Sequence, residues 1–583
     1  MLQWFIQDND LLSIDDTLVT HQQTAFSFHN DLLAKKPAVN TIPEKIIHTL
    51  NSFIQNGHVC VHESILIDTV ASKFRHSVPH IKNDIEKLAQ SKEIIIDSLS
   101  DHPTKDRIIY MPAFYVAEKE FSKRFKAFLT IPVSIEKNKI KSLLPKIELH
   151  MLINLSDEQR WVLSQVLRYK TAIITGSPGT GKTTLTRSIC LLLNHLNQEI
   201  ALTAPTGRAA QRLSELTNFK AKTIHRLLAY HPDKNEFGRN ELNPLDVDVV
   251  IIDEFSMVDI ILMYHLIKAI PMNAMIIFVG DRFQLPSVGP GNVLKDLIAS
   301  ERLPVFSLNT VFRHGKNTSL AQNAILINQG KAPEITKMKI HYHQKSSQSL
   351  SELRLVSISP DSEFSDPHFI FVIEDRVEMV LQGILLLNQQ YLPERFGVNP
   401  VHDIQVITPM HKGSVGTNHL NYMIQNHLNP SDAFIISRGN KFKYGDKVMH
   451  LKNNYEKDVY NGDIGIIHDI NPLENQCIVN YQGRLVPYTI EELNELSLAY
   501  AITVHKSQGS EYPVIIIPMV TQHYIMLQRN LLYTAVTRGK KMVCLIGSEK
   551  ALNIALKNNH QEKRYTLLCE RLKSSAGGRR LFL

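Results

Sequence analysis

One stretch of the sequence combines glycines, a lysine and a hydroxyl residue at the spacing that holds phosphate groups. Residues 176–183 read Gly-Ser-Pro-Gly-Thr-Gly-Lys-Thr and match the pattern GxxxxGK[ST] at every defined position. They follow a β-branched run, 171–175, and precede an amphipathic helical pattern, 184–193. Glycines let backbone N–H groups curl around phosphate oxygens, and the start of the next helix adds partial positive charge. The segment therefore predicts a nucleoside triphosphate site.

Individual residues of this loop have separate expected roles. We expect Lys182 to reach the β and γ phosphates of ATP and the hydroxyl of Thr183 to bind Mg²⁺. A decorative glycine-rich turn is the alternative, and the strand–loop–helix context disfavours it. The other expected nucleotide contacts form one run: Gly176, Ser177, Pro178, Gly179, Thr180, Gly181 and Thr184.

Acidic and amide side chains that could complete this site follow two later strands. The apolar run 249–252 ends in Asp253 and Glu254. Beside a phosphate loop, one such carboxylate can hold Mg²⁺ and the other can orient the attacking water, so we assign Asp253 to the metal and Glu254 to the water. Gln284 follows the next strand and could sense the γ-phosphate. In isolation these residues would be read as ordinary strand ends and a polar loop.

Two arginines outside the core of the first α/β block could touch the γ-phosphate in the transition state. They are Arg313, at the end of Val-Phe-Arg, and Arg538, at the end of Tyr-Thr-Ala-Val-Thr-Arg. A cation donated at this point accelerates phosphoryl transfer by about 10³–10⁵-fold in known cases. Since Arg538 belongs to a second block, its approach would make domain closure depend on ATP. Taken alone, the pattern around either arginine favours a surface salt bridge.

The elements that must position these groups follow from apolar periodicity. Strand and helix patterns alternate from 150 to about 330 and again from 369 to 547, which is typical of parallel sheets. Between about 430 and 497, short strands with Gly and Asn turns predict a small barrel inserted into the second block. The expected strands are 171–175, 200–204, 249–253, 275–280, 369–373, 404–408, 514–518 and 542–547.

The segment before residue 150 has a different pattern. Three helical patterns and two short β-type runs between about 42 and 112 predict a winged helix. Such folds bind nucleic acid in some proteins and other proteins elsewhere, so both partners stay open. A helix is expected near 117–129, and the lysine-bearing stretch 137–146 is interpreted as a solvated linker. Residues 332–366 are polar and are interpreted as an irregular linker or insertion.

Composition narrows the class of protein. The 583 residues are 43% apolar and 21% charged, which excludes a wholly disordered chain. No apolar run reaches the length of a membrane span, and the first residues lack a signal-peptide pattern. The 5 cysteines never form a CxxC pair, so a reducing, cytoplasmic location is expected. A net charge of +7 permits a polyanionic partner without demonstrating one.

The motif series resembles that of the superfamily 1B DNA helicases, and most closely the stand-alone RecD-like helicases, which are related to the exonuclease V alpha subunit. The resemblance runs from about Asn154 to Ala555, and it rests on the order of the motifs, since each alone recurs widely. The motifs are, in order, 156–159, 176–183, 203–210, 223–228, 253–257, 280–288, 311–313, 445–449, 503–511 and 533–538.

This resemblance implies an α/β fold with two RecA-like P-loop domains built on parallel sheets, a small SH3-like β-barrel insert and an N-terminal α+β winged-helix-like domain. The implied bounds are 1–150 for the N-terminal region, with the winged helix at about 42–112. Domain 1A would span 151–345, with a short 1B hairpin at about 229–245. Domain 2A would span 346–583, interrupted by the barrel at about 430–497.

The resemblance also implies an ATP-dependent DNA helicase that moves 5′ to 3′ on single-stranded DNA and unwinds duplex in repair or recombination. Gln159 would contact the adenine, and the hairpin at Tyr230–Pro244 would part the strands, a solvated loop being the alternative. Single-stranded and tailed duplex DNA are the implied partners. The region 1–150 could bind proteins, and no membrane partner is expected. Residues implied along the DNA path are Thr206, Arg208, Thr223, His225, Thr503, His505 and Ser507.

Two alternatives stay open. The chain could be the alpha subunit of a multi-chain exonuclease V-type complex. It could also be a nucleotide-switched DNA-binding module without productive turnover, although the intact set of expected catalytic residues argues against that.

Overall fold

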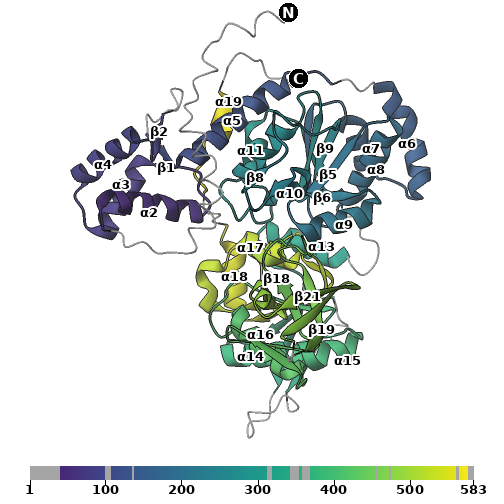
Figure 1. Ribbon diagram of the computed structural model, residues 1–583. Helices are drawn as coiled ribbons and strands as arrows, with labels where there is room; N and C mark the ends of the chain where they lie inside the picture. The colour runs from purple at the N-terminus through teal and green to yellow at the C-terminus, as the bar shows by residue number, and fades with distance from the viewer. Residues whose placement is uncertain are drawn as a thin grey trace, which may run out of the picture.

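The computed structural model describes residues 40–98, 107–133, 137–310, 318–341, 353–357, 368–454, 456–471, 474–559 and 563–574. Over these residues the chain forms an N-terminal module, two α/β domains and a small β-sheet insert (Figure 1). Arg313 lies outside the described residues. Of the helices in the described ranges, none has the length and apolar character that crossing a membrane requires.

The N-terminal module has the predicted helices and wing. Its three-stranded sheet has the order β1-β3-β2 with antiparallel pairs, and β1 is an addition that the sequence did not reveal. Its first helix begins with a capping box between Thr41 and Glu44. The elements are α2 (Ile42–Gln55), β1 (Val61–His62), α3 (Glu63–Phe74), α4 (Val78–Gln90), β2 (Ile95–Asp97) and β3 (Ile108–Tyr110).

Two helices connect this module to the first α/β domain. Helix α5 (Pro112–Leu129) packs on α11 (Ile260–Ala269), where Arg124 donates hydrogen bonds to the carbonyls of Ile267 (2.9 Å) and Lys268 (3.1 Å). The stretch interpreted as a solvated linker is instead helix α6 (Lys137–Met151). That interpretation was wrong because Ile140 and Ile147, one heptad apart on the same face, are buried in the core of the first domain.

The first α/β domain is built on a six-stranded sheet of order β11-β4-β10-β9-β5-β6, in which all neighbours are parallel. The four strands predicted here are present. The strands are β4 (Thr171–Gly176), β5 (Ile200–Ala204), β6 (Ala221–Thr223), β9 (Val249–Ile252), β10 (Met275–Gly280) and β11 (Val305–Leu308). The other elements are α7 (Asp157–Val166), α8 (Lys182–His195), α9 (Gly207–Thr217), α10 (Ile224–Leu227), α12 (Val293–Ser300) and the hairpin β7 (Tyr230–His231) and β8 (Glu236–Phe237).

The second α/β domain has a seven-stranded sheet of order β13-β12-β14-β25-β24-β15-β23, parallel except at the β12–β13 edge. The strands are β12 (Thr336–His341), β13 (Arg354–Ser357), β14 (Phe369–Ile373), β15 (Ile404–Thr408), β23 (Ala501–Thr503), β24 (Tyr512–Met519) and β25 (Gly539–Gly547). The helices are α13 (Thr318–Asn328), α14 (Val377–Leu386), α15 (Leu392–Phe396), α16 (Thr417–Leu428), α17 (Arg529–Val536) and α18 (Glu549–Lys557).

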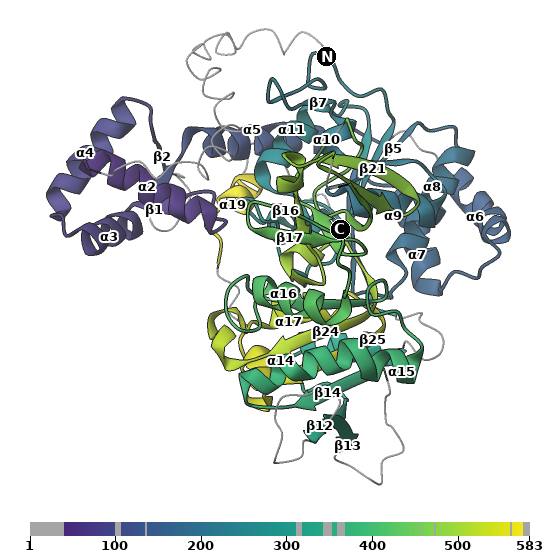
Figure 2. The same cartoon turned by 60° about the horizontal axis from the view of Figure 1, so that its bottom comes forward.

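Strands β12 and β13 lie at the outer edge of this sheet, as Figure 2 shows, and they correct the expectation of an irregular segment over 332–366. The period-two signal was present in the sequence: Thr336, Met338 and Ile340 are buried, while the two lysines between them are exposed. The polar residues that flank this short strand concealed the alternation.

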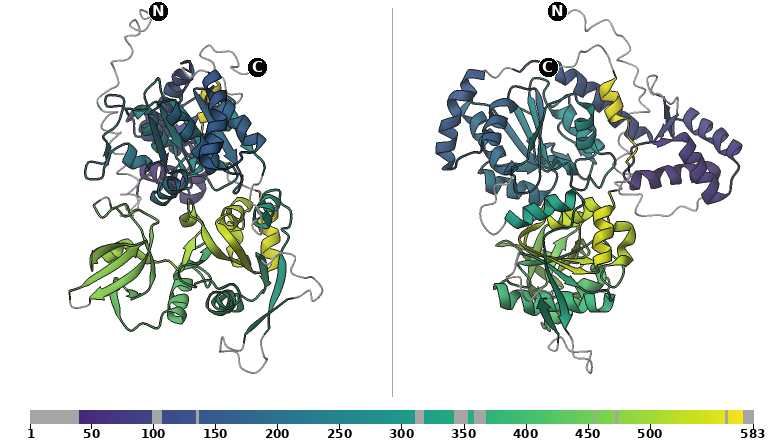
Figure 3. Two further views of the ribbon diagram at one scale, coloured as in Figure 1. Left: turned by 90° about the vertical axis from the view of Figure 1, so that its right-hand side faces the viewer. Right: turned by 180° about the vertical axis from the view of Figure 1, so that it is seen from behind.

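The predicted insert is a five-stranded antiparallel sheet of order β21-β20-β19-β18-β22 with a β16–β17 hairpin, and it stands beside the second sheet (Figure 3). It has its own core, which includes Phe442, Val479 and Tyr488. The strands are β16 (Phe434–Ser437), β17 (Asn440–Lys443), β18 (Lys447–His450), β19 (Ile464–Asn471), β20 (Gln476–Tyr481), β21 (Arg484–Thr489) and β22 (Leu496–Leu498).

Residues 563–574, here called the C-terminal segment, leave the second domain and return to the first. They include α19 (Leu568–Lys573), which lies beside α5 in Figure 1. Arg571 bonds the fully buried Glu118 of α5 (Nε to Oε1, 2.9 Å) and Asp97 of β2 (Nη2 to Oδ2, 2.5 Å). Arg302 of the first domain donates to the carbonyl of Lys573 (2.7 Å). The segment therefore fastens the N-terminal module to the first domain.

Candidate nucleotide cleft and nucleic-acid groove

The glycine-rich loop connects β4 to α8 as its sequence predicts. Gly179 and Gly181 have φ angles of 83° and 79°, which other residues rarely adopt. Lys182 begins α8, and its Nζ donates hydrogen bonds to the carbonyl oxygens of Gly176 (2.6 Å) and Ser177 (3.2 Å). The ammonium group is thus held at the loop, where phosphate oxygens of a bound nucleotide would compete for the same hydrogens.

The carboxylates predicted to act on the metal and on water lie at the end of β9. Oδ1 of Asp253 accepts a hydrogen bond from the N–H of Glu254 (2.9 Å). Burial and the neighbouring Glu254 raise the pKa of Asp253 to about 6, while Lys182 and Arg212 act in the opposite direction. Glu254 itself has a φ of 49°, in the left-handed region. Non-glycine residues in that region cost about 1–3 kcal/mol and concentrate at functional sites.

A third carboxylate, which sequence analysis did not assign, organises the next part of the cleft. Asp281 is buried after β10, and its Oδ2 accepts hydrogen bonds from the hydroxyl of Tyr533 (2.8 Å) and from Nε2 of Gln284 (3.3 Å). Burial raises the pKa of Asp281, and the nearby Lys182 opposes this rise. Asp281 therefore fixes the predicted γ-phosphate sensor, Gln284, and joins it to a tyrosine of the second domain.

Arg538 lies at the end of α17, next to this contact. It is buried, and it donates to the carbonyls of Thr534 (3.1 Å) and Ser510 (3.2 Å). Thr534 also accepts a hydrogen bond from the N–H of Leu285 in the first domain (3.0 Å). The structure thus places the predicted arginine of the second domain at the wall of the cleft, on the helix turn that contacts the first domain.

An ion pair also joins the two domains close to Asp253. Nη2 of Arg212, on α9, lies 2.7 Å from Oε2 of Glu511 in the second domain. Burial of Glu511 opposes its ionisation, but Arg212 and then Arg538 hold its pKa below the usual range. Because Arg212 also acts on Asp253, one cation connects the predicted metal carboxylate to the second domain.

Gln159, the predicted adenine contact, has a local structural role. It is buried at the start of α7, where its Oε1 accepts from the N–H of Ser156 (3.1 Å) and its own N–H donates to the Ser156 hydroxyl (3.0 Å). This capping box fixes the side chain beside the phosphate-loop domain.

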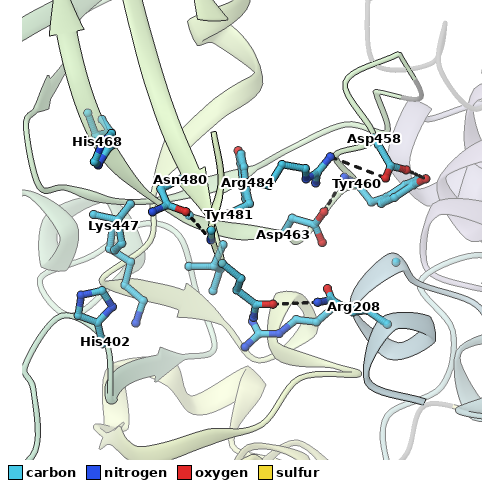
Figure 4. Close-up of a pocket in the computed structure, with 18 of the residues that line it drawn as sticks. Arg208, His402, Lys447, Asp458, Tyr460, Asp463, His468, Asn480, Tyr481 and Arg484 are labelled. Atoms are coloured by element: carbon cyan, nitrogen blue, oxygen red, sulfur yellow. Dashed lines mark hydrogen bonds and ion pairs between the residues drawn. The ribbon is translucent and has the colours of Figure 1, made fainter. Parts of the chain in front are cut away.

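A cavity of about 830 Å³ separates the first domain from the insert, and we call it the groove (Figure 4). Two predicted DNA-path residues line it, Arg208 and Thr223. Arg208 donates to the hydroxyl of Tyr512 (3.1 Å), and its guanidinium lies 4.8 Å from the centre of that ring. Further cations that sequence analysis missed also line the groove: Lys222, Arg226, Lys447 and Arg484.

Side chains of the insert reach across the groove to the first domain. Nη1 of Arg226 bonds Oδ1 of Asp458 (3.1 Å) and the hydroxyl of Tyr460 (2.9 Å). Gly207, at the start of α9, lies so close to the Tyr460 ring that an added Cβ would be 2.7–2.8 Å from it. These contacts join residues more than two hundred positions apart, so no local sequence signal marks them.

The remaining predicted DNA-path residues divide into two groups. Thr206, Thr223 and Thr503 use their hydroxyls to accept N–H groups of the turns that follow them, from Ala209, Arg226 and Lys506 respectively. Ser507 is buried and donates to the carbonyl of Val504 (2.7 Å). These hydroxyls therefore shape the segments whose backbone borders the domain cleft.

The two histidines of that set lie in different surroundings, since His225 packs among aromatic rings whereas His505 is exposed. Burial lowers the pKa of His225 to about 4, and its ring packs against Tyr230 (5.5 Å between centroids) and Phe237 (5.8 Å) of the hairpin. The pKa of His505 is lowered as well, by desolvation from the atoms packed around its exposed ring and by the charges of Arg564 and His411. Both rings are therefore neutral near pH 7, and His225 supports the hairpin.

Three family models match parts of the chain. The AAA domain matches residues 159–290, the ATP-dependent RecD-like DNA helicase SH3 domain matches 420–481, and the UvrD-like helicase C-terminal domain matches 498–546. These ranges correspond to the phosphate-loop domain, the insert and the part of the second domain that carries Arg538.

The chain is also similar to individual proteins. The ATP-dependent RecD2 DNA helicase of Deinococcus radiodurans is 34% identical over 80% of this chain, which spans only 59% of that relative's length. The RecBCD enzyme subunit RecD of Mycolicibacterium smegmatis is 29% identical over 72% of this chain and 75% of the relative. Among solved structures, a Pif1 helicase from Bacteroides in complex with ADP-AlF3 and ssDNA is 18% identical, with a TM-score of 0.41, over 69% of this chain and 94% of that one.

The fold class read from the sequence is confirmed in its two parallel sheets and its RecD-like SH3 insert. The resemblance read from the motif series is confirmed too, and the chain is a relative of the RecD-like DNA helicases.

Proposed function

We propose that this chain is an ATP-driven motor that moves 5′ to 3′ on single-stranded DNA and unwinds duplex DNA during repair or recombination. The observation that carries the proposal is the contact of Tyr533 and Thr534 with Asp281 and Leu285. It joins the second domain to the γ-phosphate side of the first. Nucleotide binding can therefore change the relative position of the two domains, while the groove borders both the first domain and the insert.

The residues of the cleft fit ATP with Mg²⁺. The hydroxyl of Thr183 and the carboxylate of Asp253 are hard oxygen donors on neighbouring elements, and Mg²⁺ usually takes one or two such groups together with phosphate oxygens and water. In the described ranges no group of three or more His, Cys, Asp or Glu side chains could enclose a metal. This supports an ion that arrives with the nucleotide.

The other residues of the cleft act on the phosphates and on water. Lys182 would exchange its loop carbonyls for phosphate oxygens, and Glu254 would orient the attacking water. Gln284, fixed by Asp281, would detect the γ-phosphate. Arg538 would neutralise charge that develops in the transition state. Arg313 keeps the same proposed role, and Gln159 keeps the role of adenine contact beside its capping function.

The groove suits a strand that is followed without reading its sequence. Its cations and hydroxyls can contact phosphate and sugar oxygens, which carry no base information. The proposed path runs along Thr206, Arg208, Thr223 and His225 of the first domain to Thr503, His505 and Ser507 of the second. Of the expected domain limits 1–150, 151–345 and 346–583, the second moves toward the N-terminus in our proposal, to before α13, because α13 and β12 pack within the second domain.

The hairpin β7–β8 is the proposed strand separator. Its Phe237 packs on His225 and, more closely, on His265 of α11 (4.6 Å between centroids). This aromatic support stabilises a short hairpin, which would otherwise be marginal on its own.

The test uses the purified full chain and duplexes with either a 5′ or a 3′ single-stranded tail. We expect ATP-dependent strand displacement only from the 5′ tail, and ATPase activity that rises when single-stranded DNA is added. Glu254→Gln should retain ATP binding and lose both activities. Displacement only from the 3′ tail would contradict the polarity. ATPase activity that stays the same when single-stranded DNA is added would contradict the proposed motor function.

A role as one subunit of a larger enzyme is the second candidate, favoured by the RecBCD enzyme subunits among the relatives. The stand-alone proposal requires the purified chain to unwind DNA without any other protein. Unwinding that appears only after a co-purifying partner is added would favour the subunit.

A further inference from the structure

The turn between α3 and α4 in the N-terminal module carries a concentration of positive charge. Lys73, Arg75 and Lys82 are exposed and have no ion-pair partner in the described part of the chain. Lys45, on α2, adds a fourth cation and lies 3.1 Å from Nε2 of His76. We call these five residues the turn patch.

Most acidic residues of the module are engaged in ion pairs or hydrogen bonds of their own. Glu63 and Glu86 pair with Arg107 (3.5 and 2.6 Å), on the wing side, and Asp84 pairs with Lys87 (2.9 Å). Glu44 is engaged in the capping box of α2, and its pKa is lowered by the backbone N–H groups of Thr41 and Asn40. Asp68 is the exposed acid that stays near the patch on α3. The turn therefore keeps a net positive charge although the module as a whole is mixed.

The patch occupies the part of this fold that faces DNA in many helix-turn-helix proteins. There the second helix of the pair lies in the major groove and the first crosses the phosphate backbone. In this module α3 and α4 are that pair, and the exposed face of α4 is polar, with His80, Asn83 and Gln90. Fold analogy alone would not decide the partner, because related modules bind proteins. The cations without ion-pair partners in the described residues favour DNA, because phosphate groups would supply the missing negative charge.

The module stands on the same support as the proposed strand separator. Helix α5 continues from β3 and packs on α11, and Phe237 of the hairpin packs on His265 of the same α11. The C-terminal segment adds a second anchor through Arg571, which bonds Asp97 of the module. Figure 1 shows the module beside the first domain, with α3 and α4 on the side away from it. The turn patch is therefore held in a fixed relation to the place where duplex would be opened.

We propose that the turn patch binds the phosphate backbone of the duplex that lies ahead of the hairpin. The location of that duplex rests on the proposed helicase function, but binding to duplex does not. A duplex fits better than a single strand, because single-strand binding usually adds exposed aromatic rings on which bases stack. The phenyl ring next to the patch, Phe74, is half-buried and has Lys45 and Lys73 over it (5.6 and 5.4 Å from Nζ to the centroid).

The experiment compares binding of the full chain to a blunt duplex and to single-stranded DNA of equal length, each fluorescently labelled, from 50 to 200 mM salt. The variant is Lys73→Ala/Arg75→Ala/Lys82→Ala. Its matched control is Lys331→Ala/Lys550→Ala/Lys557→Ala, which removes three exposed lysines from the second domain. Thermal unfolding of both variants checks that the module stays folded.

We expect the patch variant to lose at least tenfold in duplex affinity at 50 mM salt. Losing three phosphate contacts should reduce the slope of log affinity against log salt concentration by about 2.7. Raising the salt from 50 to 200 mM should therefore weaken duplex binding by the variant about 40-fold less than it weakens binding by the parent chain. Affinity for single-stranded DNA and the ATPase activity it stimulates should match the control variant.

Equal duplex affinity in the patch and control variants would overturn the proposal and would point to a protein as the partner of the turn. An equal loss for duplex and single strand would also overturn it, since the patch would then extend the strand path. If the parent chain lacks DNA-stimulated ATPase activity but the patch variant still loses duplex binding, the helicase proposal fails and the duplex site stands.

Discussion

The nucleotide cleft and the groove are both bordered by α9 and by the second domain, yet they differ in how the chain builds them. The first-domain side of the cleft comes from short continuous motifs at the ends of β4, β9 and β10. The groove comes from single side chains of the first domain, the insert and the second sheet, such as Arg226 and Asp458. Chemistry that needs a fixed local backbone is thus encoded in contiguous residues, whereas a surface for a flexible polymer is assembled from distant ones.

Charge is also used differently in the two regions. In the cleft, buried carboxylates face Lys182 and Arg212, and the pKa of Asp253 rises to about 6. In the groove, cations outnumber acids, and burial lowers the pKa of Lys447 to about 7, with Arg208 adding to the effect. The two regions should therefore respond in opposite directions to pH, and four perturbations test how separate they are.

The largest effect is expected in the cleft from Arg538→Ala. We expect kcat for ATP to fall about 10³-fold with KM nearly unchanged, because the arginine acts on charge that develops during phosphoryl transfer. Affinity for single-stranded DNA without nucleotide should stay as it was. Steady-state ATPase measurements check this, with Lys541→Ala, an exposed cation nearby, as control. A kcat within threefold of the parent would remove Arg538 from the catalytic set.

The next effect concerns the groove. Gly207→Ala should cost about 1–3 kcal/mol in free energy of unfolding, because the new Cβ would overlap the Tyr460 ring and overpacking has this cost. Basal ATPase activity without DNA should not change. Denaturant titration of the single variants and of Gly207→Ala/Tyr460→Gly completes a cycle, because the Cβ of Tyr460 lies 2.7 Å from the added methyl and must be removed with the ring. Recovery of stability in the double variant is the expected result, and additive losses would mean that the ring is not the obstacle.

The pH response of the cleft gives a third test. The proposed binding of Mg²⁺ requires Asp253 to be ionised, and its pKa is raised to about 6. The value of kcat/KM for ATP should therefore fall about tenfold for each pH unit below 6 and be level above it. A profile from pH 5 to 8, with circular dichroism to confirm folding at each point, checks this. A level profile down to pH 5 would show that Asp253 titrates near its ordinary value.

The smallest effect is the opposite response of the groove. Lys447 gains a proton as pH falls from 8 to 6, since burial lowers its pKa to about 7. One added positive charge should raise affinity for single-stranded DNA by about three- to fivefold. Lys447→Met should remove this part of the pH dependence, while other titrating groups of the groove keep theirs. An identical pH response in both proteins would exclude Lys447 as its source.

Much of the cleft could be predicted, because a strand, a turn and a helix that bind phosphate leave a contiguous pattern. Lys182 and Asp253 needed no knowledge of tertiary structure. Asp281 stands in a motif that was recognised, but its role depends on the hydroxyl of Tyr533, which reaches it from a distant part of the chain. The sequence shows that Asp281 follows an apolar strand. It does not show that Tyr533 is its partner.

The fold was harder to predict where surface chemistry masked a buried face. The lysines of α6 outweigh Ile140 and Ile147 and so predict a linker, and the polar residues that flank β12 conceal its alternating pattern. In both cases one side of the element faces water and the other the core. The number of polar residues cannot distinguish such a half-buried element from a fully solvated segment. The spacing of the apolar residues along the sequence can.

The path of the chain after α18 has a mechanical consequence. Because the C-terminal segment is bonded to Arg302 and Glu118, the second domain is joined to the rest of the molecule at both of its ends. A body attached at one end can tilt and twist freely, while one attached at two separated points mainly turns about the line between them. Each cycle of opening and closing would then repeat the same arc, and a cut in the C-terminal segment should make the stroke less reproducible before it makes the protein less stable.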